Sequence, residues 1–107
     1  MLKEAKLALG ITTQAYDARI AALLTAGAKD LMSVGVQFSG DVSLTIAADG
    51  TVTDNSTLAD NLLKEAILTY VQMRFGNPPN YDQLLAAYDS QKKKLANTSG
   101  YTEWGDS

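Results

Sequence analysis

The chain has 107 residues, of which 46% are hydrophobic and 20% charged, enough for one domain with a core and too few for two. It contains no cysteine and no histidine. Disulfides, thiolate metal sites and the Ser-His-Asp and Cys-His catalytic systems are therefore excluded, and only carboxylate chemistry stays open. The net charge of −3 argues against tight binding to DNA phosphates, because proteins that bind them normally carry a basic face.

The sequence also bears on location. No apolar run approaches the length of a membrane span. The opening residues Met1-Leu2-Lys3-Glu4 lack the hydrophobic region of a signal peptide. We therefore expect a protein that is made and used in the cytoplasm.

The first third of the chain predicts two helices. Residues 2 to 9 have apolar side chains at helical spacing, and Gly10 is a natural stop. Thr12 or Thr13 can cap the second helix, which we predict from Tyr16 to Gly35.

Two further expectations concern the side chains of the predicted helices. Gly27 lies in an Ala-rich stretch and predicts tight packing against a neighbouring helix. Asp17 and Asp89 are expected to face water. Four tyrosines on apolar stripes are predicted to be core residues with their hydroxyl groups at the edge, namely Tyr16, Tyr70, Tyr81 and Tyr88.

Residues 36 to 57 predict a β-hairpin. Apolar and polar residues alternate from Val42 to Ile46, and Asp49-Gly50 is a strong turn signal before Thr51-Val52-Thr53. A hairpin alone is only marginally stable, so it must pack on the helices or pair with another chain. Its three aspartates do not have the spacing of an EF-hand loop, and we predict no metal site from Asp41, Asp49 and Asp54.

The second half predicts two more helices. The third, from about residue 58 to 75, is apolar on most sides, so it is central to the core or lies at a subunit interface. Asn55-Ser56-Thr57 offers caps for it. The fourth runs from about residue 80 to 96 and ends in Lys92-Lys93-Lys94, which we interpret as a solvated helix end rather than a phosphate site.

The C-terminal segment carries two aromatic residues in a short polar stretch. Trp104, the only tryptophan, follows Tyr101 beyond the last predicted helix. Such residues serve as interface anchors or fold back on their own domain, and the sequence leaves both readings open.

These elements predict a mainly α fold, a small four-helix bundle with a β-hairpin or long loop between the second and third helices. The helical domain spans residues 1–100, with the insert at 37–57, and residues 101–107 form a C-terminal tail. No motif places a catalytic residue, a cofactor site or a metal site, so an enzyme is not expected.

The order of segments resembles the head–tail connector, or adaptor, proteins of long-tailed, lambda-like bacteriophages. The resemblance covers nearly the whole chain except residues 37–57, and it rests on the order and spacing of short matches rather than on any single motif. The matching residues are Leu2-Lys3-Glu4-Ala5-Lys6 with Leu9-Gly10, Tyr16-Asp17 with Ile20 and Leu23-Leu24, Ala28-Lys29-Asp30-Leu31 with Gly35-Val36, Leu62-Leu63-Lys64-Glu65-Ala66-Ile67 with Tyr70-Val71 and Phe75-Gly76, Ala87-Tyr88-Asp89, Lys94-Leu95 and Tyr101-Thr102.

The resemblance implies a structural virion protein without enzymatic activity, assembled in the bacterial host cytoplasm. It implies a homo-oligomeric ring, commonly twelve-fold, beneath the portal protein, which extends the DNA channel and supports a stopper or tail-completion protein. DNA passes through without sequence-specific binding, and no membrane takes part. The chain departs from this pattern in one respect: Arg74 is the only arginine in its second half, so a positive lining of the lumen is not evident unless the lysines provide it.

Three hypotheses about contacts accompany this reading. The second and third helices contribute to the subunit contact, with a ring interface at Leu62, Ile67, Val71 and Phe75 of the third. The hairpin meets a neighbouring subunit or the next tail component. Tyr101 and Trp104 help the tail dock on the portal. The alternative function is a small helical adaptor or regulatory protein that acts as a monomer or dimer, and a carboxylate hydrolase ranks last.

Overall fold

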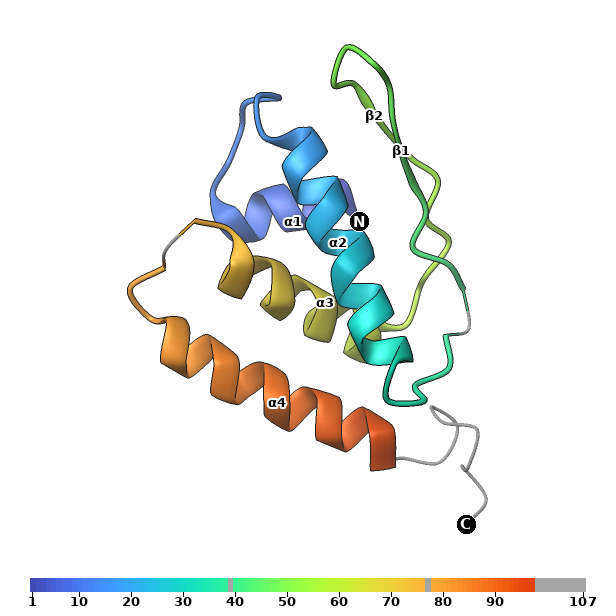
Figure 1. The fold of residues 1–107 in the computed structure, drawn as a ribbon, viewed down its shortest axis with the longest axis vertical. Coiled ribbons are helices and arrows are strands. Elements are labelled where there is room, and N and C mark those ends of the chain that lie inside the picture. Colours follow the sequence, from blue (N-terminus) through green and yellow to red (C-terminus); the bar gives the residue numbers. More distant parts are fainter. Residues whose placement is uncertain (39, 77, 98–107) are drawn as a thin grey trace.

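The computed structural model describes residues 1–38, 40–76 and 78–97. Along this part of the chain the elements are α1 (Leu2–Leu9), α2 (Asp17–Met32), β1 (Leu44–Ile46), β2 (Val52–Asp54), α3 (Asn61–Arg74) and α4 (Tyr81–Asn97) (Figure 1). The prediction of a mainly helical protein with a β-hairpin between the second and third helices is confirmed. No helix in these ranges is long and apolar enough to span a membrane.

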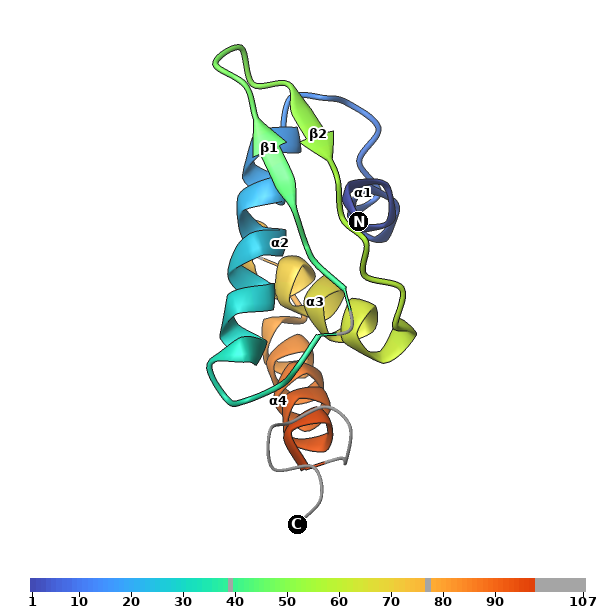
Figure 2. The same cartoon turned by 90° about the vertical axis from the view of Figure 1, so that its right-hand side faces the viewer.

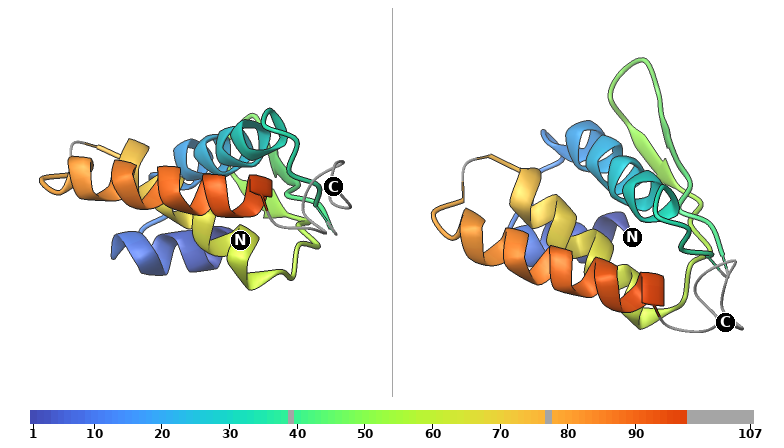
Figure 3. Two further views of the ribbon diagram at one scale, coloured as in Figure 1. Left: turned by 90° about the horizontal axis from the view of Figure 1, so that it is seen from below. Right: turned by 60° about the horizontal axis from the view of Figure 1, so that its bottom comes forward.

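The third helix of the chain is the central one. α3 packs against α1, α2 and α4, and α4 lies along it on the side away from α1 (Figures 1 and 3). The fully buried side chains come mainly from α2 and α3, because these two helices have apolar residues on the faces that meet. The largest of them are Ile20, Leu24, Leu31, Leu63, Ile67 and Val71.

Gly27 lets α2 approach α3 closely, as predicted. A Cβ atom at this position would lie 3.0 Å from Cδ1 and 3.2 Å from Cγ of Tyr70. The absent side chain therefore makes room for the aromatic ring of the neighbouring helix.

The first helix ends as predicted, and the second begins differently. Gly10 adopts a left-handed conformation with φ 71° and closes α1. The prediction that Thr12 or Thr13 caps α2 is wrong, because the cap position is Tyr16 and no side chain bonds there. The hydroxyl of Thr13 instead accepts a hydrogen bond from the backbone N–H of Ala15 at 3.2 Å, a local turn that competes with capping.

The hairpin forms where the alternation of apolar and polar residues and the Asp49-Gly50 turn signal predict it. β1 and β2 are antiparallel, with Leu44 opposite Asp54 and Ile46 opposite Val52. The turn is closed by the N–H of Thr51, which donates to the Asp49 carboxylate at 3.0 Å. The hairpin contacts α2 and projects beyond the helices (Figures 1 and 2).

The third helix starts later than predicted, and its cap is a different residue. α3 begins at Asn61 rather than near residue 58, and Asp60 accepts hydrogen bonds from the N–H groups of Leu62 and Leu63. Ser56 and Thr57 do not cap α3, because their hydroxyls accept hydrogen bonds from backbone N–H groups on the β1 side of the hairpin at 3.0 and 2.9 Å. The side chains that were expected to cap α3 therefore make contacts within the hairpin instead.

Two of the four predicted core tyrosines are not in the core. Tyr16 is 48% exposed and Tyr81 is 39% exposed, whereas Tyr88 is 2% exposed and Tyr70 is half-buried. Tyr16 is the N-cap residue of α2, and Tyr81 is the first residue of α4.

The prediction that Asp17 faces water is also wrong. Its carboxylate lies 2.9 Å from the Lys6 amine, and its side chain is only 13% exposed. The pair joins the start of α2 to α1. Asp89 is exposed on α4, as predicted.

Candidate interaction surfaces

The proposed interface residues of the third helix do not share one surface. Ile67 and Val71 are fully buried in the core of the chain, so their side chains are already covered by α2 and neighbouring elements. Leu62 is 44% exposed at the start of α3, and Phe75 is half-buried just after its end. Tyr101 and Trp104 lie outside the described residues. Of the four helix residues, Leu62 and Phe75 can contact another molecule in this conformation.

Phe75 belongs to an aromatic corner, formed by Tyr16, Arg19 and Phe75. The rings of Tyr16 and Phe75 meet edge to face, with centroids 5.5 Å apart and planes at 90°. The guanidinium carbon of Arg19 lies 5.8 Å from the Phe75 centroid. An aromatic ring has a positive edge and a negative face, so edge-to-face packing of two rings and a cation over a ring are both attractive. The two contacts join the start of α2 to the end of α3.

A shallow pocket of about 250 Å³ lies at the same end of α3. Arg74 flanks it with its guanidinium carbon 5.3 Å from the Tyr70 ring, and exposed Tyr81 forms its α4 side. Its lining residues are Met73, Arg74, Gly76, Pro78 and Tyr81. Together with the aromatic corner, this pocket forms an apolar and basic surface, called here the α3–α4 end.

A second apolar surface follows α2. Met32 is 47% exposed and Val34 is 42% exposed, beside a groove of about 430 Å³. Gly40 lines this groove and needs its lack of a side chain, because a Cβ there would lie 2.8 Å from the Thr57 carbonyl oxygen. The lining residues are Met32, Gly35, Val36, Gln37, Phe38, Gly40 and Asp41. This surface is called the α2 exit.

The two surfaces lie at different ends of the molecule. The C-terminal end of α3 and the N-terminal end of α4 are on one side, and the C-terminal end of α2 is on the opposite side (Figures 1 and 3). The sequence signal for the α2 exit was misleading: Val34 lies three residues after Leu31, at helical spacing, but α2 ends at Met32 and leaves both Met32 and Val34 exposed.

The lysine run contains a structural contact that the sequence did not suggest. Lys92 lies 3.2 Å from the Asp30 carboxylate, and its amine is 5.4 Å from the centroid of the Tyr88 ring. The same Asp30 oxygen accepts a hydrogen bond from the Tyr88 hydroxyl at 2.6 Å. Lys92 is therefore not a solvated end residue, whereas Lys93 is exposed.

This cluster shifts the pKa values of two groups. Burial and the hydrogen bond to Asp30 both raise the pKa of the Tyr88 phenol well above its usual range. Burial acts to raise the pKa of Asp30, but the hydrogen bonds from Tyr88 and Lys92 outweigh it, and the net shift is downward. The cluster therefore holds a charged carboxylate between α2 and α4.

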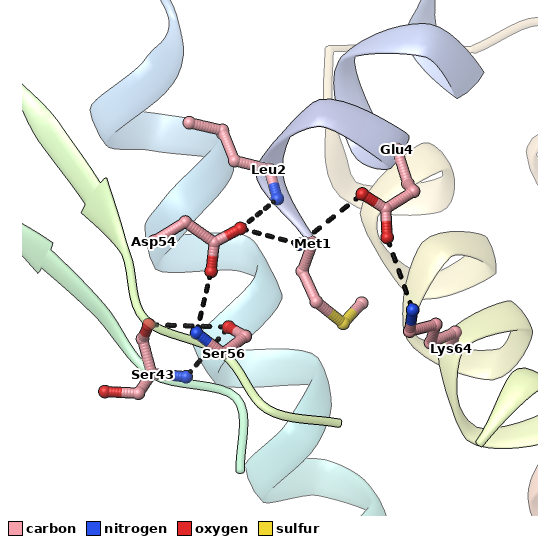
Figure 4. A network of polar contacts seen from close by, with 7 residues as sticks. All are labelled: Met1, Leu2, Glu4, Ser43, Asp54, Ser56 and Lys64. Carbon is pink, nitrogen blue, oxygen red and sulfur yellow. Dashed lines mark hydrogen bonds and ion pairs between the residues drawn. The ribbon is translucent and has the colours of Figure 1, made fainter. Parts of the chain in front are cut away.

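Asp54 makes a second polar network, between the hairpin and α1 (Figure 4). One carboxylate oxygen accepts hydrogen bonds from the Met1 amino group at 2.6 Å and the Leu2 N–H at 2.9 Å. The other accepts from the Ser56 N–H at 3.0 Å. Burial opposes ionisation here, but these bonds prevail and lower the pKa of Asp54 strongly.

The hairpin aspartates do not converge on a cation site. Asp49 closes its turn and Asp54 binds the start of α1. Within residues 1–38, 40–76 and 78–97 there is no group of three or more acidic, histidine or cysteine side chains placed to hold a metal ion.

Comparison of the chain with protein-family models, curated proteins and solved structures gives no match.

Proposed function

We propose that this protein is a head–tail connector of a bacteriophage virion, a structural subunit that assembles as a ring beneath the portal. In this proposal its four helices form a small bundle of the connector type around α3. The ring, twelve-fold in the proposal, extends the DNA channel and joins the head to a stopper or tail-completion protein. The resemblance in the order of segments motivates the assignment.

The observation that carries the proposal is the pair of exposed apolar surfaces at opposite ends of the molecule. A closed ring repeats one heterologous contact, in which a surface of each subunit meets a different surface of the next. The α3–α4 end, with Tyr81 39% exposed, and the α2 exit, with Met32 47% exposed, are two such surfaces. Exposed apolar patches with polar rims are typical of interaction sites.

The charge of the chain also supports the proposal. A net charge of −3 does not favour adhesion of the DNA backbone to the lumen, which suits a channel through which DNA must slide. The positive charge of Lys93, which is exposed on α4, reduces the electrostatic repulsion between the protein and the DNA backbone.

Not all of the expected contact residues take part in the proposed ring. Leu62 and Phe75 remain as interface candidates because they are accessible, and Ile67 and Val71 act within the core. Tyr101 and Trp104 are proposed to carry the contact with the portal, since tyrosine and tryptophan are enriched among interface anchors.

The test is to mix the protein with the portal protein encoded by the same genome and to image the product by electron microscopy. We expect a ring of this protein stacked on the portal. No association, with the protein remaining a monomer or dimer, overturns the proposal and favours the small adaptor or regulatory module. The protein alone is not a sufficient test, because a portal can be needed to nucleate the ring.

A further inference from the structure

We propose that the hairpin tip, residues 46–51, of one subunit docks in a groove on α1 of the next copy of this chain. The inference rests on the proposed ring and specifies one of its contacts. The groove, called the α1 groove, has a volume of about 370 Å³ and lies between α1 and the loop that follows it. Its lining residues are Leu2, Lys3, Lys6, Leu7, Ile11 and Thr12.

The α1 groove has an apolar floor that nothing in the chain's described residues covers. Leu7 is 73% exposed, the largest value among the large apolar side chains of these residues. Leu2 and Ile11 are only half-buried beside it. A Leu this exposed in the middle of a helix gains free energy when another surface removes it from water.

The hairpin tip has the matching chemistry. Ile46 is 47% exposed at the end of β1, and Ala47 and Ala48 after it are also exposed. The tip is narrow, because Gly50 with φ 87° closes a tight turn. It projects past the helices, so it reaches beyond the surface of its own subunit (Figure 2).

The two surfaces also have complementary charge. Asp49 is exposed at the tip, and Lys3 is exposed at the rim of the groove. Lys3 has no ion-pair partner in residues 1–38, 40–76 and 78–97. The other lysine of the groove, Lys6, is already paired with Asp17 at 2.9 Å, so its hydrocarbon stem rather than its charge lines the site. One Asp–Lys pair then fixes the orientation of the tip in the groove.

Within its own subunit the hairpin is held at other positions. Asp54 accepts a hydrogen bond from the Leu2 N–H at 2.9 Å at the hairpin base, the strands pack on α2, and residues 49–52 lie beside Gln14, Ala15 and Asp17. The proposal therefore assigns the contact to two copies. Because the tip and the groove are different surfaces, the contact is heterologous and can repeat around a ring. A hairpin tip alone buries less area than a stable dimer needs. This contact therefore supports assembly only together with the other ring contacts.

The absence of cysteine from the chain allows a direct test by disulfide trapping. We expect the double variant Leu7→Cys with Ile46→Cys, oxidised under the conditions that assemble rings on the portal, to give a ladder of cross-linked species on a non-reducing gel. A mixture of the two single variants can give only dimers. The matched control pairs Leu7→Cys with Ser90→Cys, because Ser90 is exposed on α4 and belongs to none of the proposed contact surfaces. Dimers alone from the double variant show a reciprocal pair and overturn the ring contact.

A second variant separates the failure of this contact from the failure of the proposed function. Leu7→Glu changes a side chain that is already exposed, so the far-UV circular dichroism spectrum and the Tm should be unchanged, while self-association weakens at least about tenfold. Rings on the portal without Leu7–Ile46 cross-links overturn the contact and leave the connector function standing. Cross-linking of Leu7→Cys to a cysteine of the portal instead assigns the groove to that partner and overturns the proposal.

Discussion

The hydroxyl of Tyr88 on α4 donates a hydrogen bond of 2.6 Å to the carboxylate of Asp30 on α2. α4 packs mainly on α3, so this bond and the adjacent Lys92 contact are polar links from α4 to a second helix. Hydrogen bonds to a charged acceptor are worth about 1.5–3 kcal/mol, and removing one partner leaves the other undersatisfied.

We therefore expect Tyr88→Phe to lower the free energy of unfolding by about 1–2 kcal/mol. The ring stays in the core, so the loss comes from the hydroxyl alone. Urea denaturation measures the effect, and Tyr81→Phe is the matched control because Tyr81 is 39% exposed. Equal midpoints for both variants would show that the Tyr88–Asp30 bond does not stabilise the fold.

The low pKa of Asp54 predicts a dependence of stability on acid. The folded protein lowers the pKa from its usual value of 3.8, so the unfolded state binds more protons in this range and stability falls as the pH falls. Stability from this group is present above about pH 4 and is lost below it.

Asp54→Asn should therefore lose stability at neutral pH and show a flatter decline than the wild type between about pH 4 and pH 2. Thermal unfolding at a series of pH values measures both effects. Asp89→Asn, exposed on α4, controls for the loss of one charge. A decline in Asp54→Asn as steep as in the wild type would contradict the role of this carboxylate.

The close approach of α2 and α3 predicts an effect of size at Gly27. Gly27→Val places branched atoms against the Tyr70 ring, where even a Cβ would lie 3.0 Å from Cδ1. Overpacking of this kind costs about 1–3 kcal/mol. Ala22→Val, at an exposed position of the same helix, is the control and should cost less than about 1 kcal/mol. Chemical denaturation measures the loss of stability in each of the two variants. Similar losses in both would mean that α2 and α3 can move apart freely.

The α2 exit predicts a separation of assembly from stability. Met32→Glu alters a side chain that is 47% exposed, so the free energy of unfolding should change by less than about 0.5 kcal/mol. Ring formation on the portal, counted in electron micrographs, should be lost because a charge enters an apolar contact. Ser90→Glu, exposed on α4, is the control. Normal rings from Met32→Glu would exclude the α2 exit from the subunit contact.

The proposed portal contact of the tail has its own test. Alanine at both Tyr101 and Trp104 should weaken binding to the portal without changing the Tm, because truncation of aromatic anchors commonly costs 2 kcal/mol or more, roughly a thirtyfold change in Kd. Binding is measured by co-sedimentation with assembled portals. Unchanged binding would refute the role of the tail.

The sequence by itself determined the type and order of the elements, because their signals are local. Gly10 stops α1 with its left-handed conformation, and Asp49-Gly50 closes the hairpin, since each acts through the backbone of its own neighbours. Gly27 in an Ala-rich helix likewise predicted a close contact between two helices. The expected start of α3 was wrong by a few residues, because Ser56 and Thr57 were taken up by the hairpin and Asp60 served as the cap.

Only the tertiary structure decided which apolar and charged side chains are covered. A helix as apolar as α3 predicts burial or an interface equally well, and the packing of α1, α2 and α4 around it placed Ile67 and Val71 inside. The contacts of Asp54 with Leu2 and of Asp30 with Tyr88 join residues more than 50 positions apart in the chain. Periodicity reports only on the nearest turns of a helix, so such pairings depend on how the elements pack and cannot be read from local sequence.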